Sequence, residues 1–335
     1  MLINIHLIAI QGGVIPTSVY KADMNNDVKA LILCNNPVAV PGIREFLFYQ
    51  KVGAIVVTKR NKEMQQIIRG MTENTGVPMI IVTPQDYKTK LIEAIKQYEI
   101  TVGLMMTFPF ILTEEIWTLP AKGFINFHYG LLPQCRGPQP ILWHMLNNDA
   151  EAGVTLHKVD GGIDTGEIIM QERIAIEENV TYGALQSKLA YLAAKPAANL
   201  LKILSYGTMI PSRPQDESKA AYYEMPVAKD LTINWKEMGA AIIVRLVNAC
   251  NPWNKGAGAF INNWFIGITE AEIAGETAFG EEDAGTILAC DKEQGLLVKT
   301  CDGKKLKITI VYLQEGFYSG YQLSAFSITP GMSFN

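Results

Sequence analysis

Residues 28–57 read VKALILCNNPVAVPGIREFLFYQKVGAIVV, and this stretch decides the fold class. Its two ends, Val28–Cys34 and Val52–Val57, are short apolar runs that predict buried strands. The segment Pro41–Tyr49 between them has helical character, with a proline in its first turn. Because strands that are apolar on both faces occur in sheets covered by helices on both sides, the stretch indicates a parallel sheet.

The same alternation continues towards the C-terminus. Strands are predicted at 78–82 and 102–106, and helices at 62–71 and 88–98. The fold class expected is therefore α/β, with a doubly wound, mostly parallel sheet whose ligand lies beyond the carboxyl ends of the strands. No glycine-rich dinucleotide fingerprint follows the first strand, so the sheet is not expected to bind NAD.

The alternation of apolar strands and helices ends after residue 205. A polar, proline-containing linker is predicted at 206–220, and a small open, OB-like β-barrel at 221–335. The catalytic domain would then span 28–205, and residues 1–27 form an N-terminal extension without an assigned role. Within the barrel range the sequence predicts a helix at 236–249 and strands at 259–261, 264–268, 285–288, 295–299 and 306–310.

Composition excludes several classes of protein. The 335 residues hold 29 Lys and Arg against 33 Asp and Glu, which disfavours binding driven mainly by phosphate neutralisation. The five cysteines are scattered without a C-x-x-C motif, which indicates reduced thiols in a cytoplasmic protein. No run approaches the ~18 apolar residues of a membrane span, and the apolar start lacks the basic flank of a signal peptide.

The densest cluster of unusual residues is GFINFHYGLLPQCRGP, at 123–138. Strand character over Phe124–His128 places Asn126 and His128 on one face, because side chains alternate along a strand. An imidazole can act as a general base, and a carboxamide N–H can stabilise an oxyanion. From these residues alone, the alternative of a structural, turn-capping pair stays open. Cys135 lacks the adjacent base that would activate a thiol nucleophile.

A second cluster, DGGIDTGE, occupies 160–167. Its glycines and aspartates fit either a tight turn or a loop that approaches a ligand closely. A calcium loop would need different spacing. Pairing of Asp164 with His128 would raise the pKa of the histidine and orient its ring. Cys135, His144 and His157 do not have the spacing of a zinc site, and no metal is expected.

Together the two clusters resemble the 10-formyltetrahydrofolate-dependent formyltransferases. The residues that carry the resemblance are Asn126, His128, Leu131–Pro133, Arg136–Gly137 and Asp160–Gly166. Val38–Pro41, Pro214–Glu217, Ile233–Trp235 and Asn251–Trp253 further resemble the two-domain methionyl-tRNA formyltransferases. The resemblance implies formyl transfer from 10-formyltetrahydrofolate to a primary amine, with Asn126, His128 and Asp164 as catalytic residues.

The resemblance also implies binding residues. For the folate co-substrate they are Met106, Phe108, Phe110, Ile111, Leu112, Leu131, Asp160, Gly161, Gly162 and Ile163. For the acceptor they are Gly130, Arg136, Gly137 and Trp143. Two of these roles have alternatives, since Arg136 could brace its loop and Trp143 could belong to the core. Gly130 replaces the serine usual before Leu-Leu-Pro in the family.

The acceptor stays open at this point. The barrel-like C-terminal region favours initiator methionyl-tRNA, but the long basic insertion after the second strand is absent, since Val57–Lys62 leads directly into a helix. Other segments are similar to relatives that formylate amino sugar nucleotides or carrier-bound aminoacyl groups. Hydrolysis of the folate and a non-catalytic folate-binding role are the remaining alternatives.

Overall fold

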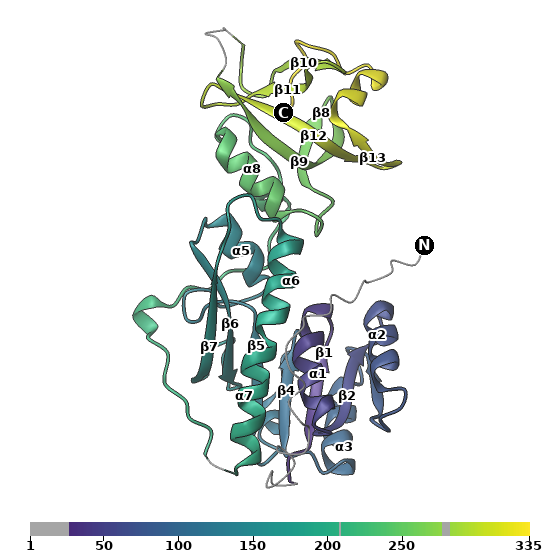
Figure 1. Cartoon of the computed structure of the whole chain (residues 1–335), viewed down its shortest axis with the longest axis vertical. Coiled ribbons are helices and arrows are strands. Elements are labelled where there is room, and N and C mark those ends of the chain that lie inside the picture. Colours follow the sequence, from purple (N-terminus) through teal and green to yellow (C-terminus); the bar gives the residue numbers. More distant parts are fainter. Residues whose placement is uncertain (1–26, 208, 277–281) are drawn as a thin grey trace, which may run out of the picture.

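The computed structural model describes residues 27–207, 209–276 and 282–335. The expected N-terminal extension, apart from Asp27, lies outside the described residues. Figure 1 shows two stacked parts, an α/β part below and an antiparallel sheet above. The predicted fold class is thereby confirmed.

The lower part is built on one seven-stranded sheet. Its strands are β1 (Ala30–Cys34), β2 (Val52–Thr58), β3 (Met79–Val82), β4 (Val102–Met106), β5 (Phe124–His128), β6 (Glu151–Lys158) and β7 (Ile168–Ala175). They lie in the order β3-β2-β1-β4-β5-β6-β7, parallel as far as β5 and antiparallel beyond it. The chain leaves β1 towards β2 on one side and returns to β4 on the other, so the β1–β4 boundary is the switch point where ligands bind.

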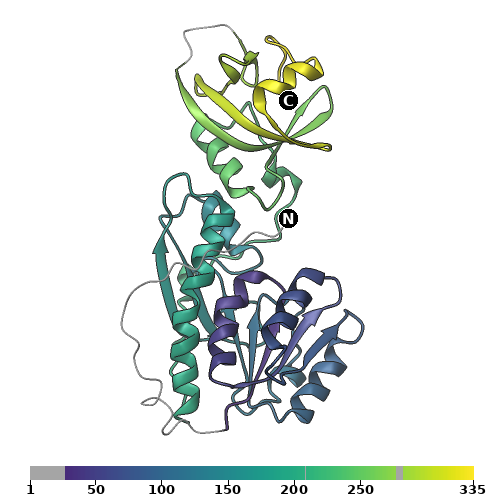
Figure 2. The ribbon, with the colours of Figure 1, turned by 45° about the vertical axis from the view of Figure 1, so that its right-hand side comes forward.

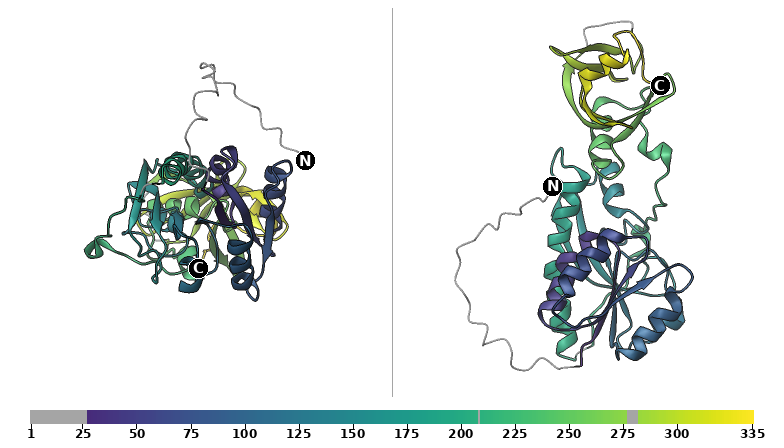
Figure 3. Two further views of the ribbon diagram at one scale, coloured as in Figure 1. Left: turned by 90° about the horizontal axis from the view of Figure 1, so that it is seen from below. Right: turned by 90° about the vertical axis from the view of Figure 1, so that its right-hand side faces the viewer.

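Helices cover both faces of this sheet. They are α1 (Val40–Phe48), α2 (Lys62–Thr72), α3 (Tyr87–Gln97), α4 (Glu114–Trp117), α5 (Pro140–Leu146), α6 (Tyr182–Leu192) and α7 (Ala194–Ser205). Alternate residues of β1 enter different cores: Ile32 packs in the cluster that holds α1, α6 and α7, whereas Leu31 and Leu33 pack with Leu91 of α3. The right-hand view of Figure 3 shows α1, α6 and α7 on one side of the sheet and α3 on the other.

Local signals explain where the helices next to the ligand edge begin. The Asn61 side chain accepts a hydrogen bond from Met64 N at 2.9 Å and caps α2. The Asn36 side chain accepts from Val38 N, also at 2.9 Å, and starts a 3-10 turn that leads into α1. Within the described residues, 3-10 turns lie at Pro37–Ala39, Glu217–Lys219, Ala228–Leu231 and Gly320–Phe326. Both caps hold the chain just beyond the ends of β1 and β2, close to the switch point.

The upper part is a curled antiparallel sheet preceded by one helix. It contains α8 (Ala240–Ala249), β8 (Ala257–Ile261), β9 (Trp264–Glu276), β10 (Ile287–Asp291), β11 (Gly295–Lys299), β12 (Lys304–Leu313) and β13 (Gly316–Ser319). The strands lie in the order β10-β11-β12-β9-β8, with β13 paired to β12. Figure 2 shows this sheet curled into an open barrel. The strand expected at 285–288 begins at Ile287, and the helix expected at 236–249 begins at Ala240.

The two parts touch at the start of α6. Gly183 N donates to Asn251 O at 3.1 Å, and the rings of Tyr182 and Trp253 lie 6.1 Å apart. α5 also packs against α8. None of the helices in the described residues combines the length and apolar character needed to cross a membrane.

Candidate active site

Strand β5 presents its polar residues as the sequence predicts. Ile125 and Phe127 are buried in the core, while Asn126 and His128 share the opposite face. His128 is the last residue of β5 and lies in the sheet next to β4. The strand therefore holds an amide and an imidazole at the carboxyl edge where ligands bind.

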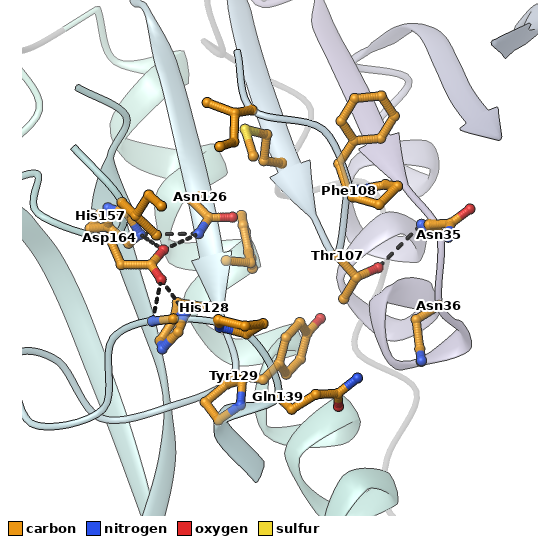
Figure 4. Close-up of a pocket in the computed structure, with 18 of the residues that line it drawn as sticks. Asn35, Asn36, Thr107, Phe108, Asn126, His128, Tyr129, Gln139, His157 and Asp164 are labelled. Atoms are coloured by element: carbon orange, nitrogen blue, oxygen red, sulfur yellow. Dashed lines mark hydrogen bonds and ion pairs between the residues drawn. The ribbon is translucent and has the colours of Figure 1, made fainter. Parts of the chain in front are cut away.

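The loop 160–166 brings Asp164 to the same place. Asp160 Oδ1 accepts from Thr165 Oγ1 at 2.6 Å and from Gly162 N at 3.1 Å, which folds the loop tightly. Asp164 Oδ2 lies 3.5 Å from His128 Nδ1, and Asp164 Oδ1 accepts from Asn126 Nδ2 at 3.2 Å. Figure 4 shows the three side chains around one point of the cavity. The structure thus brings together Asn126, His128 and Asp164, which lie up to 38 residues apart in the chain.

Hydrogen bonds determine which nitrogen of His128 is free. Its Nε2 lies 2.6 Å from the carbonyl oxygen of Cys135, which can only accept, so Nε2 carries the hydrogen. In the neutral ring Nδ1 is then the unprotonated nitrogen, and it faces Asp164. A proton taken up at Nδ1 would lie next to the carboxylate.

Burial and charge oppose each other at this pair. Burial lowers the pKa of His128 below its ordinary value, although the Asp164 carboxylate acts in the other direction. Burial alone would raise the pKa of Asp164, but His128, His157 and the N–H of Gly137 bring it below its usual range. At neutral pH the site therefore holds an ionised carboxylate and a neutral imidazole, which can accept a proton.

His157 belongs to the site, although the sequence indicated only a strand histidine. It lies opposite Asn126 in the β5–β6 register. Its Nδ1 faces the Lys158 carbonyl at 2.8 Å and must carry the hydrogen, so its Nε2 accepts from Asn126 Nδ2 at 3.0 Å. Both N–H groups of Asn126 thus have partners, and Figure 4 shows its amide oxygen directed into the cavity.

A cavity of about 580 Å³ opens beside these residues. It runs along the ends of β1, β4 and β5 and reaches the loop 160–166. Seven of the ten residues expected to bind folate line it: Phe108, Phe110, Ile111, Leu112, Asp160, Gly162 and Ile163. Phe110 packs on Tyr87, with 4.7 Å between ring centroids, so one wall is aromatic. Sequence reasoning did not single out Asn35, Asn36, Thr107, Gln139 and Tyr182, which also line the cavity.

Three residues expected to bind folate are placed elsewhere. The fully buried Met106 packs in the core beside Gly42 of α1, and its neighbour Met105 lines the cavity instead. This follows from alternation along β4. Leu131 is buried outside the lining of the cavity, and a Cβ added at Gly161, which does not line the cavity either, would meet no atom within 4 Å.

Of the residues expected to bind the acceptor, only Gly137 lines the cavity. Arg136 is buried and donates to Glu217 and Gln215, so it braces its loop. Trp143 stacks on Tyr223, and its Nε1 donates to Glu224 O at 3.1 Å. Arg136 thus has the bracing position weighed as its alternative, whereas Trp143 is only half-buried and lies outside the hydrophobic core, contrary to its alternative.

Gly130 occupies a place where a side chain has no room. A Cβ atom there would lie 2.7 Å from His128 Nε2 and 2.7 Å from Pro140 Cβ. Its carbonyl accepts from Thr155 Oγ1 at 2.7 Å, which fixes the turn after β5. The glycine therefore contributes by letting the turn pass close to the His128 ring.

Two further candidates have structural partners. Burial raises the pKa of the Cys135 thiol to about 12, so it is not a nucleophile at neutral pH. His144 Nδ1 lies 2.6 Å from Asp149 Oδ2, and its Nε2 accepts from Leu131 N at 3.1 Å. In the described residues no group of three His, Cys, Asp or Glu side chains is arranged to hold a metal.

The fold and this site belong to a known class of enzyme. The formyl transferase family matches residues 46–199, and the family of formyl transferase C-terminal domains matches residues 227–317. The chain belongs to the formyl transferase family, whose formyl donor is 10-formyltetrahydrofolate.

Within that family the chain resembles the two-domain enzymes. It is 34% identical to the methionyl-tRNA formyltransferase of Caldanaerobacter subterraneus subsp. tengcongensis, over 70% of this chain and 74% of that one. It is 33% identical to the methionyl-tRNA formyltransferase of Caldicellulosiruptor saccharolyticus, over 72% and 79%. The chain is thus methionyl-tRNA formyltransferase-like, as the sequence motifs predict.

Solved structures support the fold. The N-formyltransferase from Helicobacter canadensis, in complex with folinic acid and dTDP-3-aminofucose, aligns with a TM-score of 0.62 at 20% identity. The alignment covers 87% of this chain and 99% of that one. HypX from Aquifex aeolicus aligns with a TM-score of 0.61 at 14% identity, over 88% of this chain and 48% of that one.

The cavity has the size of a small-molecule site. Its volume lies within the ~300–1,000 Å³ of small-molecule sites. The aromatic wall of Phe108 and Phe110 offers faces for a flat heterocycle, and the ionised Asp164 and neutral His128 meet at the opposite end.

Proposed function

We propose that this chain transfers a formyl group to a primary amine at the site formed by Asn126, His128 and Asp164. The single observation that carries the proposal is the convergence of these three side chains at one end of the cavity. The proposed folate residues are those that line the same cavity, with Met105 in place of Met106.

Each side chain has a proposed task. When bound, 10-formyltetrahydrofolate supplies the formyl carbon that the amine attacks, so that negative charge develops on the formyl oxygen. Asn126 would donate an N–H to that oxygen. Both of its N–H groups have partners, so the 3.2 Å contact with Asp164 Oδ1 would be exchanged for it, while His157 holds the other.

His128 would take the amine proton at Nδ1. The Cys135 carbonyl keeps Nε2 protonated, so Nδ1 is the nitrogen available in the neutral ring. Asp164 Oδ2, 3.5 Å away, would stabilise the imidazolium that results. The imidazolium would then return the proton to N10 of the folate as the bond between N10 and the formyl carbon breaks, which releases tetrahydrofolate and the formylated amine. The N–H of Gly137 donates to the same Oδ2 at 3.0 Å and keeps the carboxylate in place.

Methionyl-tRNA is the first candidate acceptor. The relatives with 33–34% identity are methionyl-tRNA formyltransferases that align with 70–72% of the chain, and residues 227–317 match the formyl transferase C-terminal domain family. This candidate predicts that the enzyme binds tRNA and that binding weakens steeply with salt, because phosphate contacts release counterions.

A specific observation favours a second candidate, an amine on a small molecule. The range 221–335 carries nine Lys and Arg against thirteen Asp and Glu, an acidic balance for a surface that would meet tRNA. Among the described residues that line the cavity, none is Lys or Arg. This candidate predicts turnover with low-mass amines and no salt-sensitive affinity for tRNA.

One assay tests both the activity and the acceptor. The full chain is incubated with 10-formyltetrahydrofolate and, in parallel, with initiator methionyl-tRNA, methionine methyl ester, dTDP-3-aminofucose or no amine. Formylated product with any acceptor supports the proposed function, and the productive acceptor identifies the class. Formate release at the same rate without an amine would instead identify a hydrolase and contradict the proposal, as would the absence of any turnover.

A further inference from the structure

The segment 213–223, which overlaps the end of the predicted linker 206–220 and the start of the predicted barrel domain, is attached to the active-site loops. Arg213 pairs with Ile168 through two backbone hydrogen bonds of 2.8 and 2.9 Å. Further along, Arg136 N donates to Ala221 O, and Tyr223 N donates to Arg136 O, both at 2.9 Å. Figure 1 shows this stretch returning from the end of α7 alongside β7 and β6.

Gln215 lies at the centre of these contacts. Its Nε2 donates to Asp164 O at 2.7 Å and to Gly166 O at 2.8 Å. Its Oε1 accepts from Arg136 Nε at 3.2 Å and from Arg136 Nη2 at 2.9 Å. The rest of the Arg136 guanidinium binds Glu217 at 2.6 and 3.0 Å. One amide thus joins the loop of Asp164 to the loop of Arg136 and Gly137.

Asp164 requires such support. Its φ of 55° lies in the left-handed region, which is costly for a residue other than glycine unless surrounding contacts hold it. Gln215 holds its carbonyl, and the N–H of Gly137 holds its carboxylate at 3.0 Å. The contacts form a closed circuit, from Asp164 through Gly137 and Arg136 to Gln215 and back.

We propose that Gln215 is a positioning residue, which holds the Asp164 backbone so that its carboxylate faces His128 and Asn126. The role rests on the proposed function, because it acts through a proposed catalytic group. The circuit makes the segment 213–223 part of the active site. Its Gln215 holds the Asp164 loop in place, and its Tyr222 lines the cavity.

The groups around His128 define what loss of Gln215 would change. His128 faces Asp164 from the loop, His157 from β6 and His144 from α5, and its Nε2 contacts the Cys135 carbonyl. Of these, the Asp164 carboxylate is the one whose charge favours protonation of the ring. If Asp164 moves away, the pKa of His128 falls.

The test uses two measurements on the full chain that need no acceptor. One is the hydrogen exchange of the Gly137 amide, which donates directly to Asp164 Oδ2. The other is the NMR titration of His128, resolved from the other three histidines of the chain by single substitutions. Q215L removes the amide, and Q215E keeps an acceptor for Arg136 but has no N–H to donate to the loop carbonyls.

Both variants should expose Gly137 to exchange at least about tenfold faster and lower the pKa of His128 by roughly one unit. S218A is the matched control, since the Ser218 hydroxyl donates to Asp216 within the same segment. It should leave both values unchanged. If Q215L does not fold, Q215E carries the test.

If Q215E kept the wild-type exchange rate of the Gly137 amide and the wild-type pKa of His128, the proposal would be overturned. The contact with Arg136 alone would then be enough to hold the Asp164 loop. Loss of thermal stability without change at Gly137 or His128 would also overturn it, since Gln215 would then serve only to dock the segment. If both variants show these changes but the wild-type chain transfers no formyl group, the proposed function is refuted and the positioning of Asp164 by Gln215 still stands.

Discussion

At the scale of single residues, the site depends on a neutral histidine next to an ionised carboxylate. Burial keeps His128 neutral, and the Cys135 carbonyl fixes its hydrogen on Nε2. Asp164 stays ionised because His128, His157 and the N–H of Gly137 lower its pKa despite burial. The proton acceptor Nδ1 and the group that stabilises its protonated form are thus in place before substrate arrives.

Replacement of His128 by Gln should slow transfer strongly while the folate still binds. General acid–base groups contribute ~10²–10⁴-fold to rates, so kcat should fall by about that factor. Affinity for 5-formyltetrahydrofolate, measured by calorimetry, should stay within about twofold, because the aromatic wall is unchanged. Activity within a few-fold of wild type would contradict the proposed role of His128.

Asp164→Asn should move the pH dependence towards acid. The rate rises with pH as His128 loses its proton, and Asp164 is the neighbour that raises the pKa of His128. Without that charge the pKa falls further, so the acidic limb of the kcat/KM profile should shift to lower pH while the plateau drops. A limb that stays in place, or moves to higher pH, would show that Asp164 does not act on His128.

The sequence motifs predicted Asn126, His128 and Asp164, and the structure brings them together, but their catalytic roles stay predictions. His157 was missed because its importance arises from pairing across strands: β6 runs antiparallel to β5 and sets His157 opposite Asn126. Arg136 was expected to contact substrate, and its partners proved to be Gln215 and Glu217 on a distant segment. Contacts of this kind depend on tertiary structure and produce no local pattern in the amino-acid sequence.

At the scale of elements, the parallel strands were predictable because each is a short apolar run. β7 was missed because it is half exposed and carries Gln171, Glu172 and Arg173, which hide its strand character. The hairpin of β6 and β7 nevertheless matters to the site, since it supplies His157 and the two ends of the loop that carries Asp164.

The turn after β5 yields a prediction at this scale. A Cβ at residue 130 would lie 2.7 Å from both His128 Nε2 and Pro140 Cβ, and His128 cannot yield without breaking its bond to Cys135 O. Gly130→Ala should therefore lower the free energy of unfolding by about 1–3 kcal/mol and kcat by roughly 100-fold. Urea denaturation and steady-state kinetics would measure the two effects.

Gly70→Ala is the matched control for that variant. Residue 70 lies on α2 with open space around it, and alanine favours helices, so stability should be equal or higher and kcat unchanged. If Gly130→Ala left stability and kcat as this control does, the close approach of the turn to His128 would not matter for stability or activity.

At the scale of the whole molecule, the C-terminal part contacts the start of α6, which also contributes to the lining of the cavity. Tyr182 lines the cavity, where its hydroxyl donates to Gln139 Oε1 at 3.3 Å, and its ring packs beside Trp253 of the C-terminal part. Beside it, Gly183 N donates to Asn251 O. The start of α6 therefore links the C-terminal part to the wall of the cavity.

Trp253→Ala should consequently affect the acceptor and spare the donor. Loss of the indole removes the support of the Tyr182 ring, which should raise the KM for the productive acceptor several-fold, by about 1 kcal/mol of lost ring packing. The KM for 10-formyltetrahydrofolate should stay within about twofold, because the Phe108 and Phe110 rings pack on each other and on Tyr87 of α3. Phe260→Ala, which removes a comparable exposed ring packed on Phe265 within the barrel, should change neither constant. An equal rise in both KM values in Trp253→Ala would mean that the contact holds the whole site together, and an unchanged acceptor KM would mean that the barrel does not act through Tyr182.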